Sequence, residues 1–343
     1  RRSWDGRGGD ALGLRATGGR PVAVVPAVAA APDSPPDEKS ETDQQQRTTH
    51  GHGLLHTGPA EVARRPRPTP PAPATVAQMD IGQAQVTANG LDIAYLECGD
   101  GPLALLLHGF PDSPRTWRHL MPKLADAGFR AVAPWLRGYA PTGTDQGGRY
   151  QNGACVADAL AMHDVLGGDG DAVIVGHDWG ARIATGAAVL GPERWRGVVT
   201  MAVPPAGSVA EAFFSYDQLR RSWYMFFFQH PLSDVAVTMN DLEFIDRLWT
   251  DWSPGYDGSA IDLPAVKDAL RDPANLSAAL GYYRATLGGV GLVPEYEAAE
   301  GACAGTPPQP HLYLHGRDDG CMGAEVAATA EAFLTSPGSR MVM

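Results

Sequence analysis

The sequence predicts an α/β fold with a mostly parallel sheet covered by helices on both faces. Strand-like and helix-like segments alternate from about residue 79 onward, as is typical of such sheets. Two strand-like segments, 103–107 and 172–175, are continuous apolar runs, as expected for strands buried on both faces. Residues 205–300 are helix-rich and aromatic with no clear strand. They predict a helical cap inserted after the sixth strand, over the carboxyl edge where such sheets bind ligands.

Strand signals occur in eight segments: 86–87, 91–97, 103–107, 131–133, 172–175, 197–202, 311–315 and 340–343. The first two are joined by Asn89-Gly90, a strong signal for a β-hairpin turn. Helical patterns occupy the segments 116–127, 155–166, 179–190 and 324–334. This order predicts a core in two parts, 79–204 and 301–343, with the cap 205–300 between them.

Residues 1–78 differ in composition from the rest of the chain. They contain a Gly/Arg-rich start, a Gln run at 44–46 and a Pro-rich exit, and burial could not offset the entropy of ordering them. A disordered low-complexity tail is therefore predicted. A signal peptide at 20–31 is disfavoured because Pro26 breaks its apolar core.

Composition narrows the classes of partner. The formal net charge of -12 argues against nucleic acid or an anionic membrane surface and favours a neutral or apolar substrate. No apolar run approaches the roughly 20 residues that span a bilayer. The four cysteines are scattered without metal-ligand spacing, so we expect free thiols in a reducing, cytoplasmic compartment and neither a metal nor a cofactor.

The strongest chemical signal is the segment 173–181, Val-Ile-Val-Gly-His-Asp-Trp-Gly-Ala. It reads as strand, Gly-x-Asp-x-Gly, helix, which matches the tight turn of Gly-x-Ser-x-Gly hydrolases with Asp178 in the nucleophile position. The helix dipole would stabilise its carboxylate. The alternative is that Asp178 merely caps an ordinary strand–helix connection.

A second motif, His-Gly-Phe-Pro-Asp-Ser at 108–113, follows the buried strand 103–107 directly. A loop at this position can aim the backbone N–H of Phe110 at an oxyanion, with the N–H of Trp179 as the second donor. A simple Gly-Pro turn would explain Gly109 and Pro111, but not why the motif stands in this place. We expect His108 and Pro111 to line the substrate pocket.

These two motifs, together with Arg-Gly-Tyr-Ala-Pro-Thr at 137–142, resemble the soluble epoxide hydrolases of the α/β-hydrolase superfamily. The resemblance covers residues 79–343. It implies the α/β-hydrolase fold, with a mostly parallel eight-stranded sheet, and the role of nucleophile for Asp178. One departure is Trp135-Leu136 before the third motif, where relatives often have Asp before Leu.

Two cap segments extend the resemblance. Trp-Tyr-Met-Phe-Phe-Phe-Gln at 223–229 and Tyr-Tyr-Arg at 282–284 are similar to the segments that carry the two cap tyrosines of the family. The resemblance implies that Tyr224 and Tyr283 hold and protonate the epoxide oxygen. Phe228 is expected to line the pocket, although helix packing would equally explain the aromatic residues here.

The acid of the family follows the seventh strand. The segment 312–320, Leu-Tyr-Leu-His-Gly-Arg-Asp-Asp-Gly, places Asp319 there, in preference to Asp318. Asp-Asp-Gly is also an ordinary turn. Some relatives carry the acid after the sixth strand, but 203–207 contains no carboxylate.

The family histidine has no counterpart after Asp319, because residues 320–343 contain no His. His108, His177, His311 and His315 belong to other loops or strands, and none is assigned as the base. The chain starts at Arg1 and ends on an apolar run, from which we expect truncated ends. We accordingly expect a catalytic histidine beyond residue 343 and impaired turnover. We also expect poor folding, because the final strand and helix of the core are expected to be missing after the start of a strand at 340–343.

The resemblance implies an epoxide hydrolase, an ether-bond hydrolase with a detoxifying role, that forms an aspartyl ester. Its partners would be a small apolar epoxide and water, and a homodimer is a further expectation. Two alternatives stay open. A haloalkane or haloacid dehalogenase uses the same aspartate, although haloalkane dehalogenases tend to have Asn where Phe110 stands. A non-catalytic relative would keep the pocket without turnover.

Overall fold

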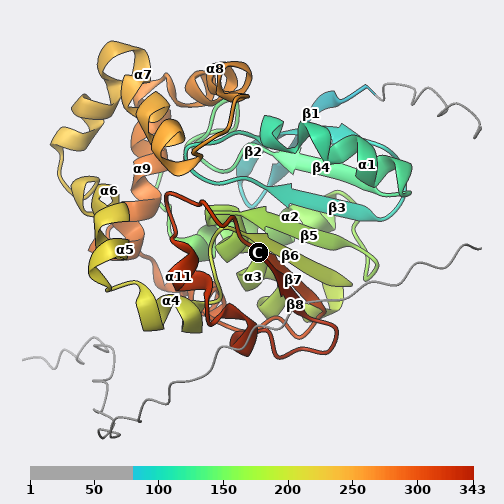
Figure 1. The fold of residues 1–343 in the computed structure, drawn as a ribbon. Helices are drawn as coiled ribbons and strands as arrows, with labels where there is room; N and C mark the ends of the chain where they lie inside the picture. The colour runs from blue at the N-terminus through green and yellow to red at the C-terminus, as the bar shows by residue number, and fades with distance from the viewer. Residues whose placement is uncertain (1–79) are drawn as a thin grey trace, which may run out of the picture. The chain divides into compact units, whose positions relative to one another are not determined.

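The computed structural model describes residues 80–343, and the predictions for residues 1–78 lie outside them. The described chain builds one eight-stranded sheet in the order β1-β2-β4-β3-β5-β6-β7-β8 (Figure 1). The strands are β1 (Gly82–Ala88), β2 (Leu91–Cys98), β3 (Leu103–Leu107), β4 (Arg130–Pro134), β5 (Val173–His177), β6 (Gly197–Met201), β7 (His311–Leu314) and β8 (Arg340–Val342).

The sheet is mostly parallel, as predicted. Only the β1/β2 and β2/β4 pairs are antiparallel. The hairpin between β1 and β2 turns through Asn89 and Gly90, whose φ angles of 48° and 74° are those of a tight two-residue turn. β8 lies within the strand segment expected at 340–343, and it pairs with β7 over three residues.

The α-helices are α1 (Met121–Asp126), α2 (Asn152–Val165), α3 (Trp179–Leu190), α4 (Ala206–Ala212), α5 (Tyr216–Arg221), α6 (Trp223–Phe227), α7 (Leu232–Trp252), α8 (Ser259–Leu270), α9 (Pro273–Gly288), α10 (Glu297–Ala302) and α11 (Ala324–Ala327). Short 3₁₀ segments lie at Pro114–His119, Pro192–Arg194, Pro294–Tyr296 and Ala330–Phe333. None of the helices in residues 80–343 combines the length and the apolar character needed to cross a bilayer.

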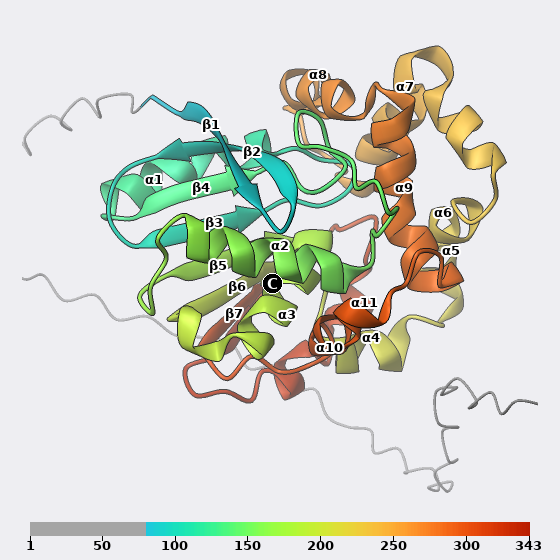
Figure 2. The ribbon, with the colours of Figure 1, turned by 180° about the vertical axis from the view of Figure 1, so that it is seen from behind.

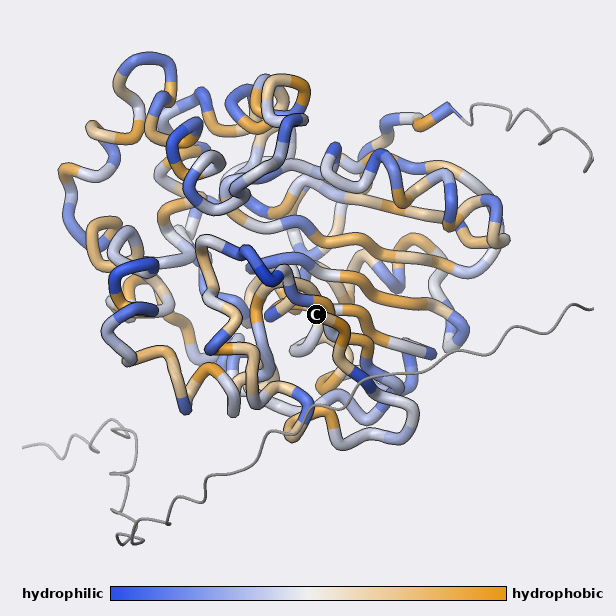
Figure 3. Tube along the Cα trace, viewed as in Figure 1, coloured by the Kyte–Doolittle hydropathy of each residue, from blue (hydrophilic) through white to orange (hydrophobic). Residues whose placement is uncertain are grey.

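The core forms where apolar strands are covered on both sides. All five residues of β3 are buried, and Figure 3 shows the hydrophobic colour concentrated along the central strands. α2 and α3 pack against each other and lie in front of the sheet in Figure 2, with α3 against β5 and β6. α1 packs against β4. Burial on both faces explains why β3 and β5 lack polar alternation.

The segment after β6 is helical, as predicted, and its helices α5 to α9 gather at one end of the sheet (Figure 1). α7 contains a break, because Met239 to Leu242 leave the helical backbone. α10 packs on α2 and α3 of the core instead of on the cap. The described residues form one compact unit, so the boundaries at 204 and 300 stay predictions.

Two predicted helices are broken in the structure. The segment 116–127 divides into the 3₁₀ segment Pro114–His119 and α1. Pro122 stands at the start of α1, where it has no backbone N–H to continue the preceding turn. The segment 324–334 likewise divides into α11 and the 3₁₀ segment Ala330–Phe333. By contrast, α3 matches its predicted range of 179–190.

Candidate active site

The turn between β5 and α3 holds Asp178 in a strained conformation. Its φ of 54° and ψ of -118° lie where non-glycine residues are rare. A Cβ at Gly176 would lie 2.0 Å from the carbonyl oxygen of Gly180. A Cβ at Gly180 would in turn lie 2.1 Å from that of Leu107. Gly176 is therefore required for the turn to close on itself, and Gly180 for the turn to pack against β3.

The carboxylate of Asp178 does not cap α3 with its side chain. Its Oδ1 instead accepts a hydrogen bond of 2.8 Å from the backbone N–H of Phe110. Burial raises the pKa of Asp178 to about 6, while the N–H groups of Phe110 and Trp179 oppose that rise. The two N–H groups predicted as oxyanion donors thus act on the same carboxyl group.

The loop 108–113 approaches Asp178 very closely. A Cβ at Gly109 would lie 2.3 Å from Oδ1 of Asp178, so only glycine fits. The ring of His108 is fully buried, with Nδ1 2.8 Å from the carbonyl oxygen of Gly109 and Nε2 accepting from the N–H of Leu136. Contrary to our expectation, His108 lines neither cavity beside Asp178, because both ring nitrogens are used to fix the loop to the segment after β4.

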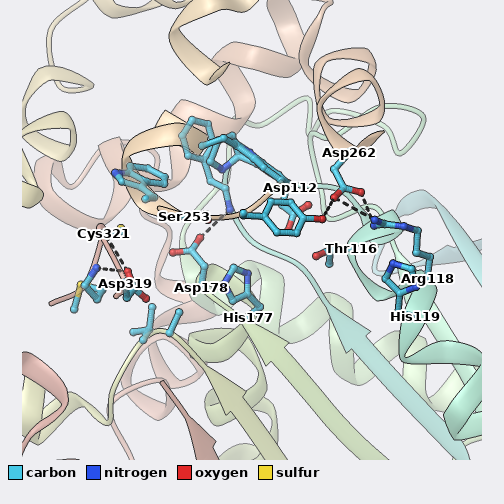
Figure 4. A pocket seen from close by; sticks show the side chains of 18 residues that line it. Asp112, Thr116, Arg118, His119, His177, Asp178, Ser253, Asp262, Asp319 and Cys321 are labelled. Atoms are coloured by element: carbon cyan, nitrogen blue, oxygen red, sulfur yellow. Dashed lines mark hydrogen bonds and ion pairs between the residues drawn. The ribbon is translucent and has the colours of Figure 1, made fainter. Parts of the chain in front are cut away.

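Two cavities meet at the nucleophile position. The first, of about 310 Å³, is called here the polar cavity. It is lined by Asp178, Asp319 and several other polar residues, and by apolar residues that include Phe110 and Pro111. Figure 4 shows Asp178 between Asp319 on one side and Asp262 and Arg118 on the other. The second, of about 240 Å³, is called the apolar cavity, and its lining residues include Asp178, Trp179, Tyr224 and Tyr283. Asp178, Val203, Cys321 and Met322 line both cavities.

The two cap tyrosines lie together over the apolar cavity. Tyr224 comes from α6 and Tyr283 from α9, and their ring centroids are 5.5 Å apart in an edge-to-face arrangement. Burial raises the pKa of both phenols well above the usual value, so both hydroxyls stay protonated near neutral pH. The Tyr224 hydroxyl lies 3.3 Å from Sγ of Cys321. The site therefore offers two neutral proton donors.

Phe228 does not line either cavity, contrary to our expectation. It is fully buried and packs edge-to-face against Phe110, at 5.6 Å between centroids, and against Tyr283, at 5.1 Å. Its position at the end of α6 directs the ring behind these two residues. Phe228 therefore packs behind Phe110 and Tyr283, which line the cavities.

Asp319 lines the polar cavity together with Asp178 and His177, whereas Asp318 is exposed. Oδ1 of Asp319 accepts hydrogen bonds from the backbone N–H groups of Cys321, at 2.8 Å, and Met322, at 2.9 Å. These bonds hold the carboxylate at the floor of the cavity. Of the two adjacent carboxylates, Asp319 is thus the one that faces Asp178.

Several residues of the polar cavity were missed in the sequence. Arg118 forms an ion pair with Asp262 of α8, and Tyr256 hydrogen bonds to the same carboxylate. Burial raises the pKa of Asp112 to about 7. Arg118 and Asp262 are 144 positions apart, so no local pattern could join them. Asp112 belongs to the motif 108–113, but the residues beside it in the sequence do not indicate that it is buried.

The candidate site contains no obvious metal centre. Residues 80–343 hold no cluster of three or more His, Cys, Asp or Glu side chains that could ligate an ion. The four cysteines are all free, as predicted. What the site presents is a partly buried carboxylate on a strained turn, two backbone donors, two phenols and a second carboxylate. This arrangement can support nucleophilic attack by a carboxylate on a neutral substrate.

A strained strand–helix turn on a sheet of this order defines an α/β hydrolase. The model of the alpha/beta hydrolase fold family matches residues 102–342, and the chain belongs to that family. Within it, the chain belongs to the epoxide hydrolases, as its relatives show.

Three relatives illustrate the match. The epoxide hydrolase of Caballeronia sordidicola is 29% identical over 273 residues, which cover 70% of this chain and 79% of that one. Epoxide hydrolase 3 of Xenopus tropicalis is 31% identical over 254 residues, covering 68% and 67% respectively. The crystal structure of epoxide hydrolase A from Mycobacterium thermoresistibile is similar with a TM-score of 0.62 at 25% identity, covering 77% of this chain and 90% of that one.

Proposed function

We propose that the protein opens small apolar epoxides to vicinal diols through an ester of Asp178. The observation that carries the proposal is that Asp178, Tyr224 and Tyr283 line one cavity. An epoxide there would meet a nucleophile on one side and two proton donors on the other. Opening the strained ring requires both.

In the first half-reaction, an oxygen of Asp178 attacks one ring carbon and forms the ester bond. The bond from that carbon to the ring oxygen breaks, and its electron pair passes to the oxygen. A proton from Tyr224 or Tyr283 then converts the developing alkoxide into a hydroxyl. Their high pKa values support this role, because both phenols are protonated when the substrate binds.

In the second half-reaction, water attacks the carbonyl carbon of the Asp178 ester. The negative charge that develops on the carbonyl oxygen would be stabilised by the N–H groups of Phe110 and Trp179. The bond between the carbonyl carbon and the alkoxy oxygen of the diol then breaks, which restores the carboxylate. One proton of the water passes to that oxygen and the other returns to the tyrosine that gave up its proton. The family resemblance implies that a histidine paired with Asp319 activates the water. Within residues 80–343 no histidine hydrogen bonds to Asp319, so we expect this half-reaction to be slow in the 343-residue chain.

The test is intact-mass analysis of the 343-residue chain after incubation with styrene oxide. We expect one adduct to accumulate, and peptide mapping to locate it at Asp178. The variant Asp178→Asn should form no adduct. Replacing Tyr224 and Tyr283 by Phe should slow adduct formation by about 100-fold or more, the usual contribution of general acids. An adduct elsewhere would refute the nucleophile, and rapid steady production of diol would refute the assigned need for a histidine.

A dehalogenase is the second candidate. Nε1 of Trp179 is buried and lacks a hydrogen-bond partner among residues 80–343, so it could donate to a halide beside Asp178. Halide release from 1-bromobutane, compared with diol formation from an epoxide, separates the two activities. A relative without catalytic activity would give neither product and no adduct.

We infer a cytoplasmic, detoxifying hydrolase acting on ether bonds, with a homodimer as its expected state. Cell fractionation and light scattering of the purified protein would test the location and the oligomer.

A further inference from the structure

Four carboxylates line the polar cavity: Asp112, Asp178, Asp262 and Asp319. Arg118 is the one Lys or Arg among its lining residues in the described chain, and it is already paired with Asp262. The proposed mechanism uses Asp178 and Asp319, but it gives no role to Asp112. The cavity therefore carries an excess of negative charge that the mechanism does not explain.

Asp112 is the carboxylate of this group that most needs an explanation. Its side chain is 7% exposed, and its Oδ1 accepts a hydrogen bond of 2.7 Å from the backbone N–H of Ser113. It takes part in no ion pair among residues 80–343. Burial, together with the nearby carboxylates of Asp262 and Asp178, raises the pKa of Asp112 to about 7. A buried carboxylate at a cavity without a cation is costly.

Aromatic rings form the wall beside these carboxylates: Phe110, Trp249, Trp252 and Tyr256. Nε1 of Trp249 donates a hydrogen bond of 2.8 Å to the carbonyl oxygen of Pro111, and the hydroxyl of Tyr256 donates to Asp262. The polar edges of both rings are thus occupied, and the ring centroids lie 6.2 Å apart. Aromatic rings attract positive charge to their faces, as in the sites that bind quaternary ammonium groups.

The carboxylates and the rings together restrict the occupant of the polar cavity. A neutral apolar group would displace water from the carboxylates without replacing its interactions, which costs free energy. The described carboxylates are not clustered as metal ligands, because residues 80–343 hold no group of three or more His, Cys, Asp or Glu side chains that could ligate an ion. An organic cation matches both features, since its charge would face the carboxylates and its alkyl groups would contact the rings.

The polar cavity is continuous with the reacting groups. Asp178 lines it, and also lines the apolar cavity together with Tyr224 and Tyr283. Figure 4 shows Asp112 on the side of Asp178 away from Asp319. An epoxide between Asp178 and the tyrosines can therefore extend a substituent past Asp178 into the polar cavity. A positive charge on that substituent would also favour the ionised, nucleophilic form of Asp178.

We infer that the polar cavity binds a cationic group of the substrate, and that the protein acts on epoxides with a quaternary or protonated amine one or two carbons from the ring. The inference rests on the proposed function and extends its substrate class from apolar epoxides to these cations. The ammonium group takes no part in bond making or breaking. Asp112 and the aromatic wall hold it, and thereby orient the epoxide beside Asp178.

The experiment compares two epoxides of nearly the same shape. Glycidyltrimethylammonium carries one positive charge, and neopentyloxirane has a carbon atom in place of the nitrogen. The rate of Asp178 adduct formation is measured by intact mass at subsaturating epoxide and pH 8. Each rate is divided by the rate of the same epoxide with acetate in water, which removes the difference in intrinsic reactivity. We expect the normalised rate of the cation to exceed that of its neutral twin by about 10-fold.

Two variants test the role of the carboxylate. In Asp112→Asn the ratio of the cation rate to the neutral rate should fall by about 5-fold, whatever happens to both rates together. Asp217→Asn is the matched control, because it removes the same charge from a side chain that is 74% exposed, outside the polar cavity. Its ratio should equal that of the wild type, since solvent and salt screen an exposed charge.

A second pair of variants tests the aromatic wall. Tyr256→Leu removes a ring from the cavity and should lower the ratio by about 2-fold or more. Tyr256→Phe keeps the ring and removes only the hydroxyl that donates to Asp262, so its ratio should stay close to that of the wild type. Tyr256 is 45% exposed, and the fold should tolerate both changes.

The outcomes separate this inference from the proposed function. If no epoxide alkylates Asp178, the proposed function itself fails. If the neutral epoxide reacts at least as fast as the cation after normalisation, or Asp112→Asn lowers the ratio no more than Asp217→Asn, only the cation site is refuted. If Asp112→Asn does not fold, the wild-type ratio and the two Tyr256 variants decide, since equal ratios in Tyr256→Leu and Tyr256→Phe also overturn the inference.

Discussion

At the scale of single residues, Asp178 combines three features that lower stability and favour reactivity. It is held at a φ of 54°, it is packed against Gly109, and burial raises its pKa to about 6. Each costs folding free energy while leaving a desolvated carboxylate ready to attack. Proteins commonly accept such strain at functional sites.

The pKa of Asp178 leads to a prediction about stability. A carboxyl group whose folded-state pKa exceeds the unfolded value destabilises the fold as the pH rises from about 4 through 6. At pH 8, Asp178→Asn should therefore melt at a higher temperature than the wild type, with a free energy of unfolding larger by on the order of 2 kcal/mol. At pH 4 the gain should be much smaller. Thermal melting at both pH values measures the difference. A gain that does not depend on pH would show that burial of the charge is not the cause.

The contact between the Tyr224 hydroxyl and the Cys321 thiol also affects reactivity. A thiol is a weak hydrogen-bond partner, so the Tyr224 hydroxyl can exchange it for an epoxide oxygen at little cost. Cys321 also donates its backbone N–H to Asp319. One residue thus contacts both a proton donor and the second carboxylate of the site.

At the scale of elements, the approach of β3, β5 and α3 determines where the nucleophile stands. The carbonyl oxygen of Leu107 at the end of β3 lies so close to Gly180 that any side chain would displace one of the two. The glycine in the first turn of α3 is needed for packing between elements.

This contact gives a matched pair of variants. Gly180→Ala should cost about 3 kcal/mol or more, since overpacking against backbone cannot be relieved by a rotamer change. Gly301→Ala in α10 is the control, because nothing lies within 4 Å of its added Cβ, and it should be neutral or stabilising by up to about 1 kcal/mol. Urea unfolding of both variants measures the difference. Equal stabilities would contradict the close packing.

At the scale of the whole described molecule, Arg137 connects three parts of the chain. Its side chain pairs with Asp158 of α2, and Asp158 also accepts a hydrogen bond from Asn89 in the first hairpin. The carbonyl oxygen of Arg137 accepts a 2.9 Å hydrogen bond from the hydroxyl of Tyr282 of α9 in the cap. The loop after β4 thereby joins the sheet, the core helices and the cap.

Removing one partner of this buried pair should affect the whole fold. Arg137→Met leaves the Asp158 carboxylate without its cation, which typically costs about 3–5 kcal/mol. The double variant Arg137→Met/Asp158→Leu should regain much of that loss, because the uncompensated charge is gone. Arg220→Met, which breaks an exposed pair with Asp217, serves as the control and should barely change the urea midpoint. A double variant no better than the single one would contradict this account.

Local sequence determined most of the fold. The apolar runs of β3 and β5, the Asn89-Gly90 turn and the range of α3 follow from patterns a few residues long, because side-chain alternation and turn chemistry act over that distance. The glycines beside Asp178 belong to the same class. They indicate a tight turn whatever the rest of the chain does.

Contacts between distant segments were decided only by the tertiary structure. The burial of His108 against Leu136 and the ion pair of Arg118 with Asp262 each depend on which elements pack together. Phe228 was expected at the cavity wall and lies behind it, because a residue type does not reveal which way a helix end points. The sequence by itself therefore determined the elements and the nucleophile turn. Packing decided which side chains reach the cavities, since long-range contacts form only when the hydrophobic faces of the elements are buried together.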